Sequence, residues 1–406
     1  MEIEDILGYP AERAARGEPE FEETYMRRLR LFSRRFYSYR PLLALLESLS
    51  GSRRRAREVD ILFLGTSFLH LMLQTRSRHS IASLVEEKHD LRMVRRHAIP
   101  PGFAWKWKVD LYRAYTATTD TRRRELLELT VADIERTLRR FSPRVVVLKN
   151  DSLFLERAVI TAARSLGIPA VTIQHGLFMR VIESSLFDGY WTDHMLVWGE
   201  VFRDLYLEND ILPEGRVHVL GYPFPVTPIP ARSIDDPPTI CLLGQPWELY
   251  VESLREMKYQ VISTLRDACA RMEIDLIYRP HPAEQRDALI NSFPSLRLTS
   301  ESATLGEAIN SYDYFLSWTS TALIEAALHG RSAAQIRSDA VPMDDFSAIG
   351  ACFQIEGNEE GIVRYLEGVK RSEYPPMAVN DRYVHITADP GEEFSIIFQN
   401  ITDPGV

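Results

Sequence analysis

Short apolar runs alternate with longer helical segments along most of this chain, and no other feature limits its fold as strongly. The clearest example begins with "RVVVLKND", continues through "SLFLERAVITAARSLG" and ends with "IPAVTIQHG". A short apolar run of this kind is typical of a strand buried on both faces. Strands that alternate with helices pair in parallel, and the helices cover both sides of the sheet. The chain is therefore predicted to be an α/β protein.

The alternation stops once and then starts again. The stretch "YPFPVTPIPARSIDDPP", Tyr222 to Pro238, is rich in proline and is typical of a stiff linker between domains. After it, "TICLLGQP", "IDLIYRPHP", "YDYFLSW" and "RSAAQIR" are again predicted strands. At 406 residues the chain exceeds one ordinary core. We predict a helical segment at 1–57, Rossmann-like domains at 58–228 and 229–375, and a C-terminal segment, 376–406, that packs back on the first domain.

Within the first domain, Val59 to Leu64 is a predicted strand that runs into a Gly-Thr-Ser turn, and "LRMVRR" is predicted as the next strand. Residues 105–141 are predicted to form one or two helices with alternating charge.

Charge and cysteine content narrow the class of protein. A formal net charge of -9 argues against a nucleic-acid partner, which would require a basic surface. The three cysteines are scattered and lack the spacing of metal ligands, as in a reduced, cytoplasmic protein. The start, "MEIEDILGYP", resembles no signal peptide, and no apolar run is long enough to span a membrane.

The segment from Arg27 to Arg57 is rich in arginine and aromatic residues. A basic amphipathic segment can lie on an anionic lipid surface, so a peripheral contact with the inner face of the membrane is one interpretation. The alternative is a solvated helix whose arginines pair with nearby glutamates.

Polar segments follow six predicted strands, where ligands of open α/β sheets gather. These segments are "GTS" at Gly65, "KND" at Lys149, "QHG" at Gln174, "GQP" at Gly244, "RPHP" at Arg279 and "SWTST" at Ser317. Each segment alone is compatible with a turn. All six, however, lie at the carboxyl ends of their strands, as a cleft between two sheets would require.

The segment "RPHP" carries the sharpest chemistry. Two prolines restrict the backbone and remove two amide donors, so neither a strand nor a helix continues through it. Arg279 offers a planar fork of donors to phosphate, and His281 can donate ring protons to phosphate oxygens or a proton to a leaving phosphate. The alternative is a proline-rich turn with an incidental surface histidine.

The segment "SWTSTALIEAALHG" places hydroxyl groups where a helix begins. Ser317, Ser320 and Thr321 are candidates for contacts with phosphate, which the free amides and dipole of a helix start favour. Capping of the helix is the commoner role of such hydroxyls. Glu325, one turn further, is a candidate for the ribose hydroxyls or a solvated helix residue.

The first domain supplies the candidates for the acceptor side. Asp151 is a candidate general base that activates an acceptor hydroxyl, although an aspartate after a strand is also a common helix cap. His175 is a second catalytic candidate, and Thr66, Ser67 and Gln174 are assigned to the acceptor side by their place after strands.

Several motifs are absent from the sequence. There is no G-x-G-x-x-G, no P-loop, no nucleophile elbow and no HExxH. No Asp-x-Asp pair is present to hold a metal ion on a diphosphate. We therefore expect no metal site and no cofactor, with phosphate held by Arg279, His281, hydroxyls and helix ends.

The motifs together resemble those of a known group. "QHG", "TDHMLVWGEVFRDLYLENDILPEGRVHVLGYP", "RPHP" and "SWTSTALIEAALHG" are similar to segments of GT-B-fold glycosyltransferases of bacterial surface polysaccharides. More narrowly, the HP and Ser motifs resemble those of bacterial sialyltransferases, polysialyltransferases and capsule Kdo transferases, and of CDP-glycerol glycerophosphotransferases. The resemblance covers roughly residues 145–330. It implies that His281 is the HP histidine and that Ser317, Ser320 and Thr321 form the Ser motif.

The resemblance implies a metal-independent transferase with two Rossmann-like domains whose sheets face across a cleft. It would move a sialic acid-like sugar or Kdo from a CMP-activated donor to a glycan or lipid-linked glycan. Gly244 and Gln245 are expected to approach the nucleotide. The alternatives are a CDP-polyol phosphotransferase, a UDP-sugar transferase or epimerase, and a catalytically silent scaffold of a polysaccharide assembly complex.

Overall fold

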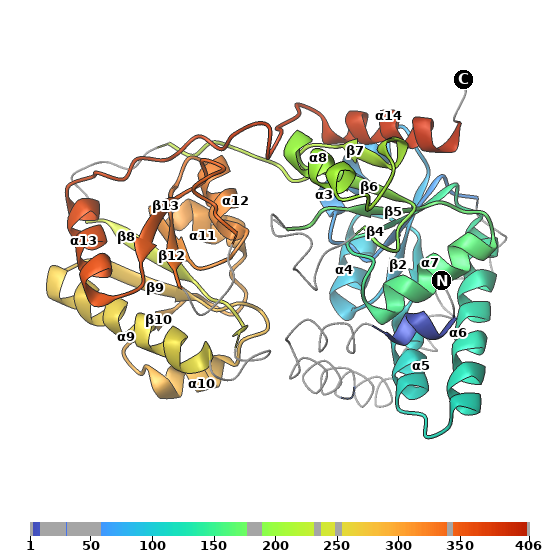
Figure 1. Ribbon diagram of the computed structural model, residues 1–406, viewed down its shortest axis with the longest axis horizontal. Helices are drawn as coiled ribbons and strands as arrows, with labels where there is room; N and C mark the ends of the chain where they lie inside the picture. The colour runs from blue at the N-terminus through green and yellow to red at the C-terminus, as the bar shows by residue number, and fades with distance from the viewer. Residues whose placement is uncertain are drawn as a thin grey trace. The chain divides into compact units, whose positions relative to one another are not determined.

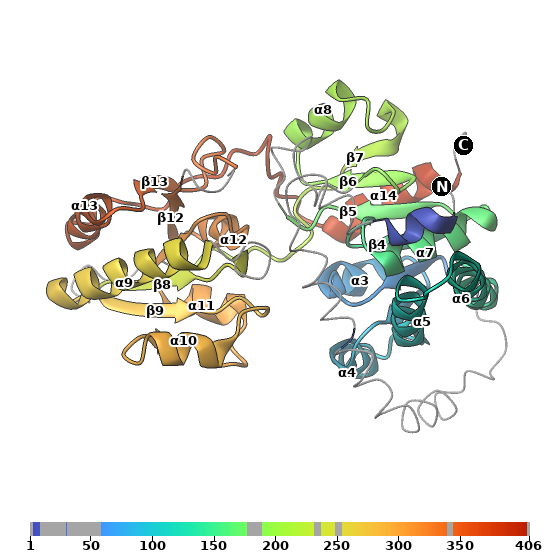
Figure 2. The same ribbon diagram turned by 60° about the horizontal axis from the view of Figure 1, so that its bottom comes forward.

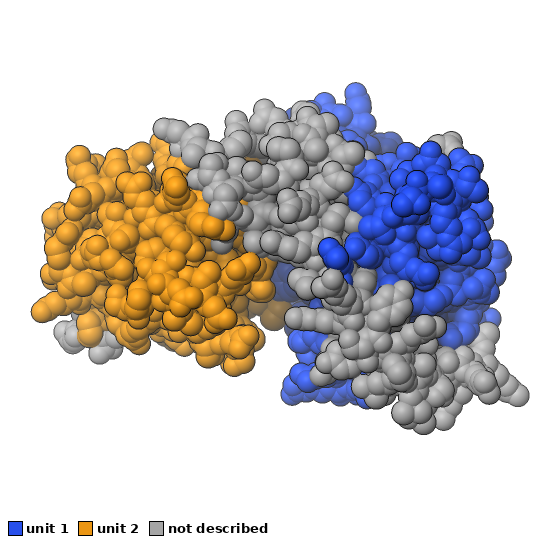
Figure 3. All heavy atoms as spheres, turned by 90° about the horizontal axis from the view of Figure 1, so that it is seen from below, with its two compact units in different colours: residues 1–175, 181–224, 384–406 blue, residues 176–180, 225–383 orange. Residues whose placement is uncertain are grey.

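The computed structural model describes residues 3–8, 30, 58–176, 189–230, 237–247, 254–338 and 344–403, and every structural statement concerns these residues. The chain divides into two compact units, and each is described by itself (Figures 1 and 3). Unit 1 comprises residues 1–175, 181–224 and 384–406, and unit 2 comprises residues 176–180 and 225–383. Most of the predicted helical segment 1–57, including the basic stretch from Arg27 to Arg57, lies outside the described residues.

Unit 1 is built on a sheet that, in the described part of the chain, has seven strands in the order β3-β2-β1-β4-β5-β6-β7. The strands are β1 (Ile61–Leu64), β2 (Ile81–Val85), β3 (Pro101–Phe103), β4 (Val145–Leu148), β5 (Ala170–Ile173), β6 (His194–Val197) and β7 (Val217–Val219). All neighbours pair in parallel; Ile61, for example, lies opposite Ile81 on one side and Val145 on the other. Every residue of β1, β4 and β5 is buried, as predicted for strands covered on both faces.

Two groups of helices in unit 1 pack closely together (Figures 1 and 2). The elements are η1 (Ile3–Leu7), α3 (Leu69–Thr75), α4 (Lys88–Arg96), α5 (Trp105–Tyr115), α6 (Asp120–Phe141), α7 (Phe154–Ser165), α8 (Glu200–Glu208), η2 (Glu214–Arg216) and α14 (Pro390–Thr402). Helices α5, α6 and α7 pack against one another, and α14 packs against α3, while α4 contacts β2 and α8 contacts β6 and β7. The rings of Phe63 on β1 and Phe394 on α14 lie 6.2 Å apart, so the last helix completes the core of unit 1.

The prediction of a strand at "LRMVRR" is wrong, because this segment forms most of helix α4. Glu87 and Asp90 form a capping box at the start of this helix, in which each side chain accepts a hydrogen bond from the other residue's backbone. The strand of this region is β2, "IASLV", which lies just before it. The cap and the arginine-rich face outweigh the short apolar alternation that suggested a strand.

Unit 2 repeats the design with strand order β10-β9-β8-β11-β12-β13. Its strands are β8 (Thr239–Leu243), β9 (Asp275–Arg279), β10 (Arg297–Leu298), β11 (Tyr314–Ser317), β12 (Ser332–Arg337) and β13 (Phe353–Glu356). Its helices are α9 (Leu254–Met272), α10 (Arg286–Ser292), α11 (Leu305–Ser311), α12 (Ala322–Leu328) and α13 (Glu359–Lys370). Its neighbouring strands also pair in parallel, so both units are Rossmann-like, as predicted. Among the described residues, no helix is long and apolar enough to cross a membrane.

Candidate functional site

Three of the predicted site segments of unit 2 lie together at one edge of its sheet. The strand order reverses between β8 and β11, and ligands of open α/β sheets bind at this switch point. "GQP" follows β8, "RPHP" follows the neighbouring strand β9, and "SWTST" begins at the end of β11. Thr319 Oγ donates a hydrogen bond of 3.2 Å to Gln245 Oε1 and so joins two of these segments directly.

A buried ion pair holds the first two segments in place. Lys258 on α9 is fully buried, and its Nζ lies 2.7 Å from Glu284 Oε1 and 3.0 Å from the carbonyl oxygen of Gln245. The Tyr278 hydroxyl donates to the same carboxylate oxygen at 2.6 Å. Burial raises the pKa of Glu284, and the opposing effect of the Lys258 charge does not cancel it. Lys258 therefore ties the "GQP" turn to Glu284, which lies two positions after the end of "RPHP".

Gly244 is required by this network. An added Cβ at Gly244 would overlap the Glu284 carboxylate and lie 2.7 Å from the Tyr278 hydroxyl. Because no side chain fits there, the carboxylate can occupy the space directly behind the turn. The predicted approach of Gly244 to a nucleotide stays a prediction; what the structure adds is a local reason for glycine.

His281 is exposed, and its backbone and ring are both oriented by hydrogen bonds. Its backbone N–H donates to Glu284 Oε2 at 2.5 Å, and the backbone N–H of Ala283 donates to its Nδ1 at 3.1 Å. A ring nitrogen that accepts a hydrogen bond carries no proton, so the proton of the neutral ring lies on Nε2. His281 therefore presents an N–H donor through Nε2.

Two further donors lie at the same strand ends. The Nε of Arg279 and the Nε1 of Trp318 are buried and have no hydrogen-bond partner among the described residues. Trp318 is fully buried, and Arg279 is half-buried. A buried donor without an acceptor costs about 1–3 kcal/mol, so native proteins rarely leave one unpaired. Together with His281 Nε2, these groups suit a ligand rich in acceptors, such as a phosphate.

The hydroxyls of the Ser motif divide into different roles. Ser317 is fully buried, and its Oγ donates to the carbonyl oxygen of Leu243, so it ties β11 to β8. Ser320 Oγ accepts a hydrogen bond of 3.3 Å from the N–H of Ala322. Thr321 is the N-cap residue of α12, and its side chain makes no capping hydrogen bond. Ser320, Thr321 and Glu325 are half-buried, and their assignment to a ligand stays a prediction.

In unit 1, the residues assigned to the acceptor side make mostly internal contacts. Thr66 Oγ donates to Asp90 Oδ1 at 2.6 Å, and Ser67 beside it is exposed. Gln174 is buried, and its side-chain and backbone oxygens accept hydrogen bonds of 2.8 Å from Trp198. His175 is exposed at the end of β5. Gln174 therefore links the ends of β5 and β6, and His175 keeps the more accessible position.

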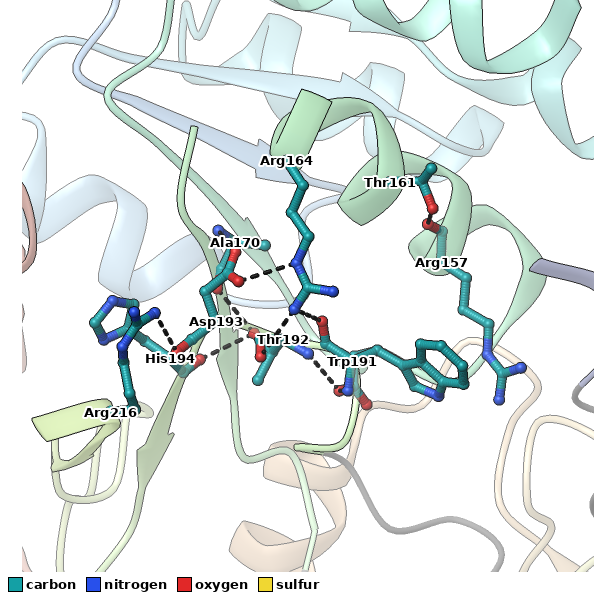
Figure 4. A network of polar contacts seen from close by, with 10 residues as sticks. Arg157, Thr161, Arg164, Ala170, Trp191, Thr192, Asp193, His194 and Arg216 are labelled. Carbon is teal, nitrogen blue, oxygen red and sulfur yellow. Dashed lines mark hydrogen bonds and ion pairs between the residues drawn. The ribbon is translucent and has the colours of Figure 1, made fainter. Parts of the chain in front are cut away.

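Asp151, the predicted general base, is fully buried. Its Oδ2 accepts hydrogen bonds from the backbone N–H groups of Gly189, Trp191 and Thr192 at 3.0, 2.7 and 2.9 Å. Arg164 on α7 holds the same turn through the carbonyl oxygen of Trp191 (Figure 4). A carboxylate that satisfies three backbone donors stabilises a turn. As a general base Asp151 stays a prediction, and these contacts weigh against it.

Unit 1 also holds a charged cluster that sequence reasoning missed. Glu86 follows β2, Lys149 follows β4, and Lys108 and Glu156 lie in the first turns of α5 and α7. Lys108 Nζ lies 2.8 Å from a Glu86 carboxylate oxygen, and both Glu86 and Glu156 are at most 4% exposed. A glutamate directly after an apolar strand was a usable signal for Glu86. Nothing local distinguishes Lys108 or Lys258 from an ordinary helix-surface lysine.

The sequence matches no protein-family model, and no curated protein matches it significantly. Solved structures match the fold. MnaA of S. aureus, in a structure with UDP, is 12% identical, with a TM-score of 0.59 over 84% of this chain and 96% of that one. UDP-GlcNAc 2-epimerase of Neisseria meningitidis, bound to UDP-GlcNAc, is 15% identical, with a TM-score of 0.58 over 84% and 98%.

MurG of Acinetobacter baumannii is 12% identical, with a TM-score of 0.52 over 84% of this chain and 99% of that one. Together with the two parallel, Rossmann-like sheets, these likenesses show that the chain has the predicted GT-B fold. The narrower resemblance to transferases that use CMP-sugars stays a prediction.

Proposed function

We propose that this protein is a glycosyltransferase that uses a nucleotide sugar and binds the donor's phosphate at the switch point of unit 2. The observation that carries the proposal is the set of three N–H donors at the ends of β9 and β11. His281 presents Nε2, and the buried donors of Arg279 and Trp318 have no partner among the described residues. A donor phosphate would accept all three hydrogen bonds and take the charge of Arg279.

The same donors suit the chemistry of transfer. When the bond between the sugar and the donor phosphate breaks, negative charge develops on the phosphate oxygens. Donors that are already oriented stabilise that charge without reorganising. Glu284 orients His281 through its backbone, so the Nε2 donor is in place before the donor substrate binds.

For the donor we propose a CMP-activated sugar, either sialic acid-like or Kdo, because the HP and Ser motifs resemble those of enzymes that use such donors. For the acceptor we propose a glycan or lipid-linked glycan. We expect turnover without a divalent cation, since the sequence has no Asp-x-Asp pair. Release of nucleotide that persists in EDTA would support this, and release that needs added magnesium would contradict it.

A second candidate is a UDP-sugar enzyme, either a transferase or a 2-epimerase. It is favoured by the fold neighbours solved with UDP or UDP-GlcNAc. Incubation with UDP-GlcNAc alone separates the two activities, because an epimerase changes the sugar's configuration without any acceptor.

Thermal unfolding with CMP, CDP, UMP, UDP, GDP and ADP tests the proposal. A ligand at about a hundred times its dissociation constant stabilises the folded protein by about 2.7 kcal/mol. We expect cytidine nucleotides to raise the melting temperature of the wild type and of His89→Ala, an exposed histidine of unit 1, but not that of His281→Ala. Stabilisation by uridine nucleotides alone would favour the UDP-sugar candidate. If no nucleotide raises the melting temperature, the proposal fails and a scaffold without catalysis becomes the better interpretation.

A further inference from the structure

The charged cluster of unit 1 lies at the switch point of its own sheet. The strand order of unit 1 reverses between β1 and β4, the place where an open α/β sheet binds ligands. Gly65 follows β1, Glu86 follows the neighbouring strand β2, and Lys149 and Asn150 follow β4. Glu156 is the third residue of α7, which starts shortly after β4, so its side chain belongs to the same edge.

Glu86 is the ionised member of the cluster. Burial raises its pKa, but the charges of Lys108 and Lys149 outweigh burial, so the pKa of Glu86 is lowered. An added Cβ at Gly65 would lie 2.8 Å from Glu86 Oε1, so the glycine makes room for this carboxylate. The pair of Glu86 and Lys108, 2.8 Å apart, is therefore a built feature of the strand end.

Glu156 differs from Glu86 because no cation is close enough to pair with it. It is 2% exposed, and within the described ranges no other residue forms an ion pair or side-chain hydrogen bond with its carboxyl group. Burial, followed by the charge of Glu86, raises the pKa of Glu156 to about 7, although Lys149 and Lys108 act in the opposite direction. A group with this pKa both holds and releases a proton near neutral pH.

Other groups of the edge also lack partners. The Oδ1 of Asn150 is buried and has no hydrogen-bond partner among the described residues, and Lys149, half-buried, makes no ion pair with any of them. The edge thus offers a cationic donor, an amide acceptor and a carboxyl group that can donate or accept.

The combination of a cationic donor, an amide acceptor and a carboxyl group indicates which class of ligand can bind at this edge. Two carboxyl groups would repel a phosphate, and the two lysines already balance the charge of the carboxyl groups. A hydroxyl group both donates and accepts a hydrogen bond, so a neutral, hydroxyl-rich molecule such as a sugar can satisfy all three unpaired groups.

We propose that this switch-point cluster of unit 1 binds the hydroxyl groups of the acceptor and that Glu156 takes the proton of the attacking hydroxyl. The inference rests on the proposed function. The hydroxyl oxygen forms a bond to the anomeric carbon of the donor sugar while the bond from that carbon to the donor phosphate oxygen breaks. The phosphate leaves with the electron pair, and the hydroxyl proton moves to the Glu156 carboxylate.

The test measures hydrolysis of a donor, in which water supplies the hydroxyl. CMP-N-acetylneuraminic acid and UDP-GlcNAc serve as probes, and chromatography measures the released nucleotide. We expect Glu156→Gln to reduce release by about 10²–10⁴-fold while the nucleotide still raises the melting temperature as in the wild type. The rise of wild-type release near pH 7 should be absent in the variant; Glu86, Lys108 and Lys149 are the charged groups that face Glu156.

The matched control is Glu135→Gln. Glu135 is a partly buried carboxylate on α6 that accepts a hydrogen bond from Ser165 at the opposite end of α7. We expect this variant to release nucleotide at the wild-type rate. Should Glu156→Gln not fold, Glu156→Asp decides, because it keeps a carboxyl group but moves it away from the edge; release at the wild-type rate would then overturn the inference.

The outcomes separate the two proposals. A folded Glu156→Gln that releases nucleotide at the wild-type rate overturns the role of Glu156 and leaves the proposed function standing. A wild-type protein that neither responds to any nucleotide nor hydrolyses either donor overturns the proposed function, and the inference falls with it. Loss of release together with loss of the nucleotide-induced shift also overturns the inference, because Glu156 would then affect unit 2 rather than proton transfer.

Discussion

Lys258 Nζ lies 2.7 Å from Glu284 Oε1, and neither side chain has any exposed surface. Unit 1 contains a counterpart, in which Lys108 Nζ lies 2.8 Å from Glu86. In each unit the carboxylate comes after the strand that neighbours the unit's first strand in the chain, β1 or β8. The glycine that follows β1 or β8, Gly65 or Gly244, leaves room for this carboxylate. The two pairs differ in the pKa of the carboxylate, which is lowered in Glu86, where two lysines are nearby, and raised in Glu284, where one is.

Removing one partner of the Lys258–Glu284 pair should destabilise unit 2. Lys258→Met leaves a buried carboxylate without its cation, and such a change costs about 3–5 kcal/mol. The double variant Lys258→Met/Glu284→Gln should lose less than the sum of the single variants, because no charge is left uncompensated. Urea unfolding of the four proteins measures both quantities.

The control for this cycle is an exposed pair on α13. Arg364 and Glu360 form an ion pair of 2.6 Å with side chains 70% and 82% exposed. Arg364→Met should change the free energy of unfolding by less than about 1 kcal/mol. If Lys258→Met and Arg364→Met lower the free energy of unfolding by equal amounts, burial does not set the contribution of the Lys258–Glu284 pair, and the prediction is contradicted.

Gly244→Ala adds only one methyl group, but it should disturb the proposed phosphate site. The new methyl group would overlap the Glu284 carboxylate, which would move and carry the backbone of His281 with it. We expect a loss of nucleotide-induced stabilisation and a lower melting temperature. Gly306→Ala in α11, where an added Cβ meets no atom within 4 Å, should instead be neutral or stabilising by up to about 1 kcal/mol. Equal nucleotide responses in the two variants would contradict the proposed geometry.

Glu156 should make the stability of unit 1 fall as pH rises. Its pKa is about 7 in the folded protein and 4.5 as its ordinary value, so the folded state holds the proton more tightly. The resulting stabilisation is fully present below about pH 4.5 and is lost as pH rises through 7, with a total change of about 3 kcal/mol. Glu156→Gln should remove this dependence, which unfolding at pH 5 and pH 8 measures. Identical pH dependence in both proteins would show that Glu156 titrates normally.

Asp151→Ala should act on stability. Loss of the carboxylate leaves three buried backbone N–H groups without their acceptor, at a cost of about 2–3 kcal/mol or more. Asp151→Asn keeps one acceptor oxygen and should be folded, with nucleotide release within a few-fold of the wild type. If Asp151→Asn is fully folded but releases no nucleotide, the result supports Asp151 as the general base.

Much of the architecture follows from local pattern. Buried parallel strands carry short apolar runs and the helices between them carry a period of 3.6, so two α/β domains were predictable from the pattern. The GT-B fold was predicted from the resemblance of the motifs to those of a known group. The predicted polar segments after β8, β9 and β11 do meet at one edge, because all carboxyl ends of a parallel sheet point the same way. The segment 91–96 was assigned to the wrong element because apolar alternation over six residues is compatible with both a strand and a capped helix.

The roles of individual carboxylates were not predictable in this way. Asp151 and Glu156 are five positions apart, and only Asp151 was a candidate general base from the sequence. In the structure Asp151 meets three backbone donors from residues 189–192, and Glu156 meets no partner among the described residues. Lys258 and Glu284 are 26 positions apart, and neither neighbourhood contains a sign of the other. Periodicity is a local property of the chain and can be read from it. Burial and pairing, which set the charge and proton affinity of a side chain, depend on residues that meet only when the chain has folded.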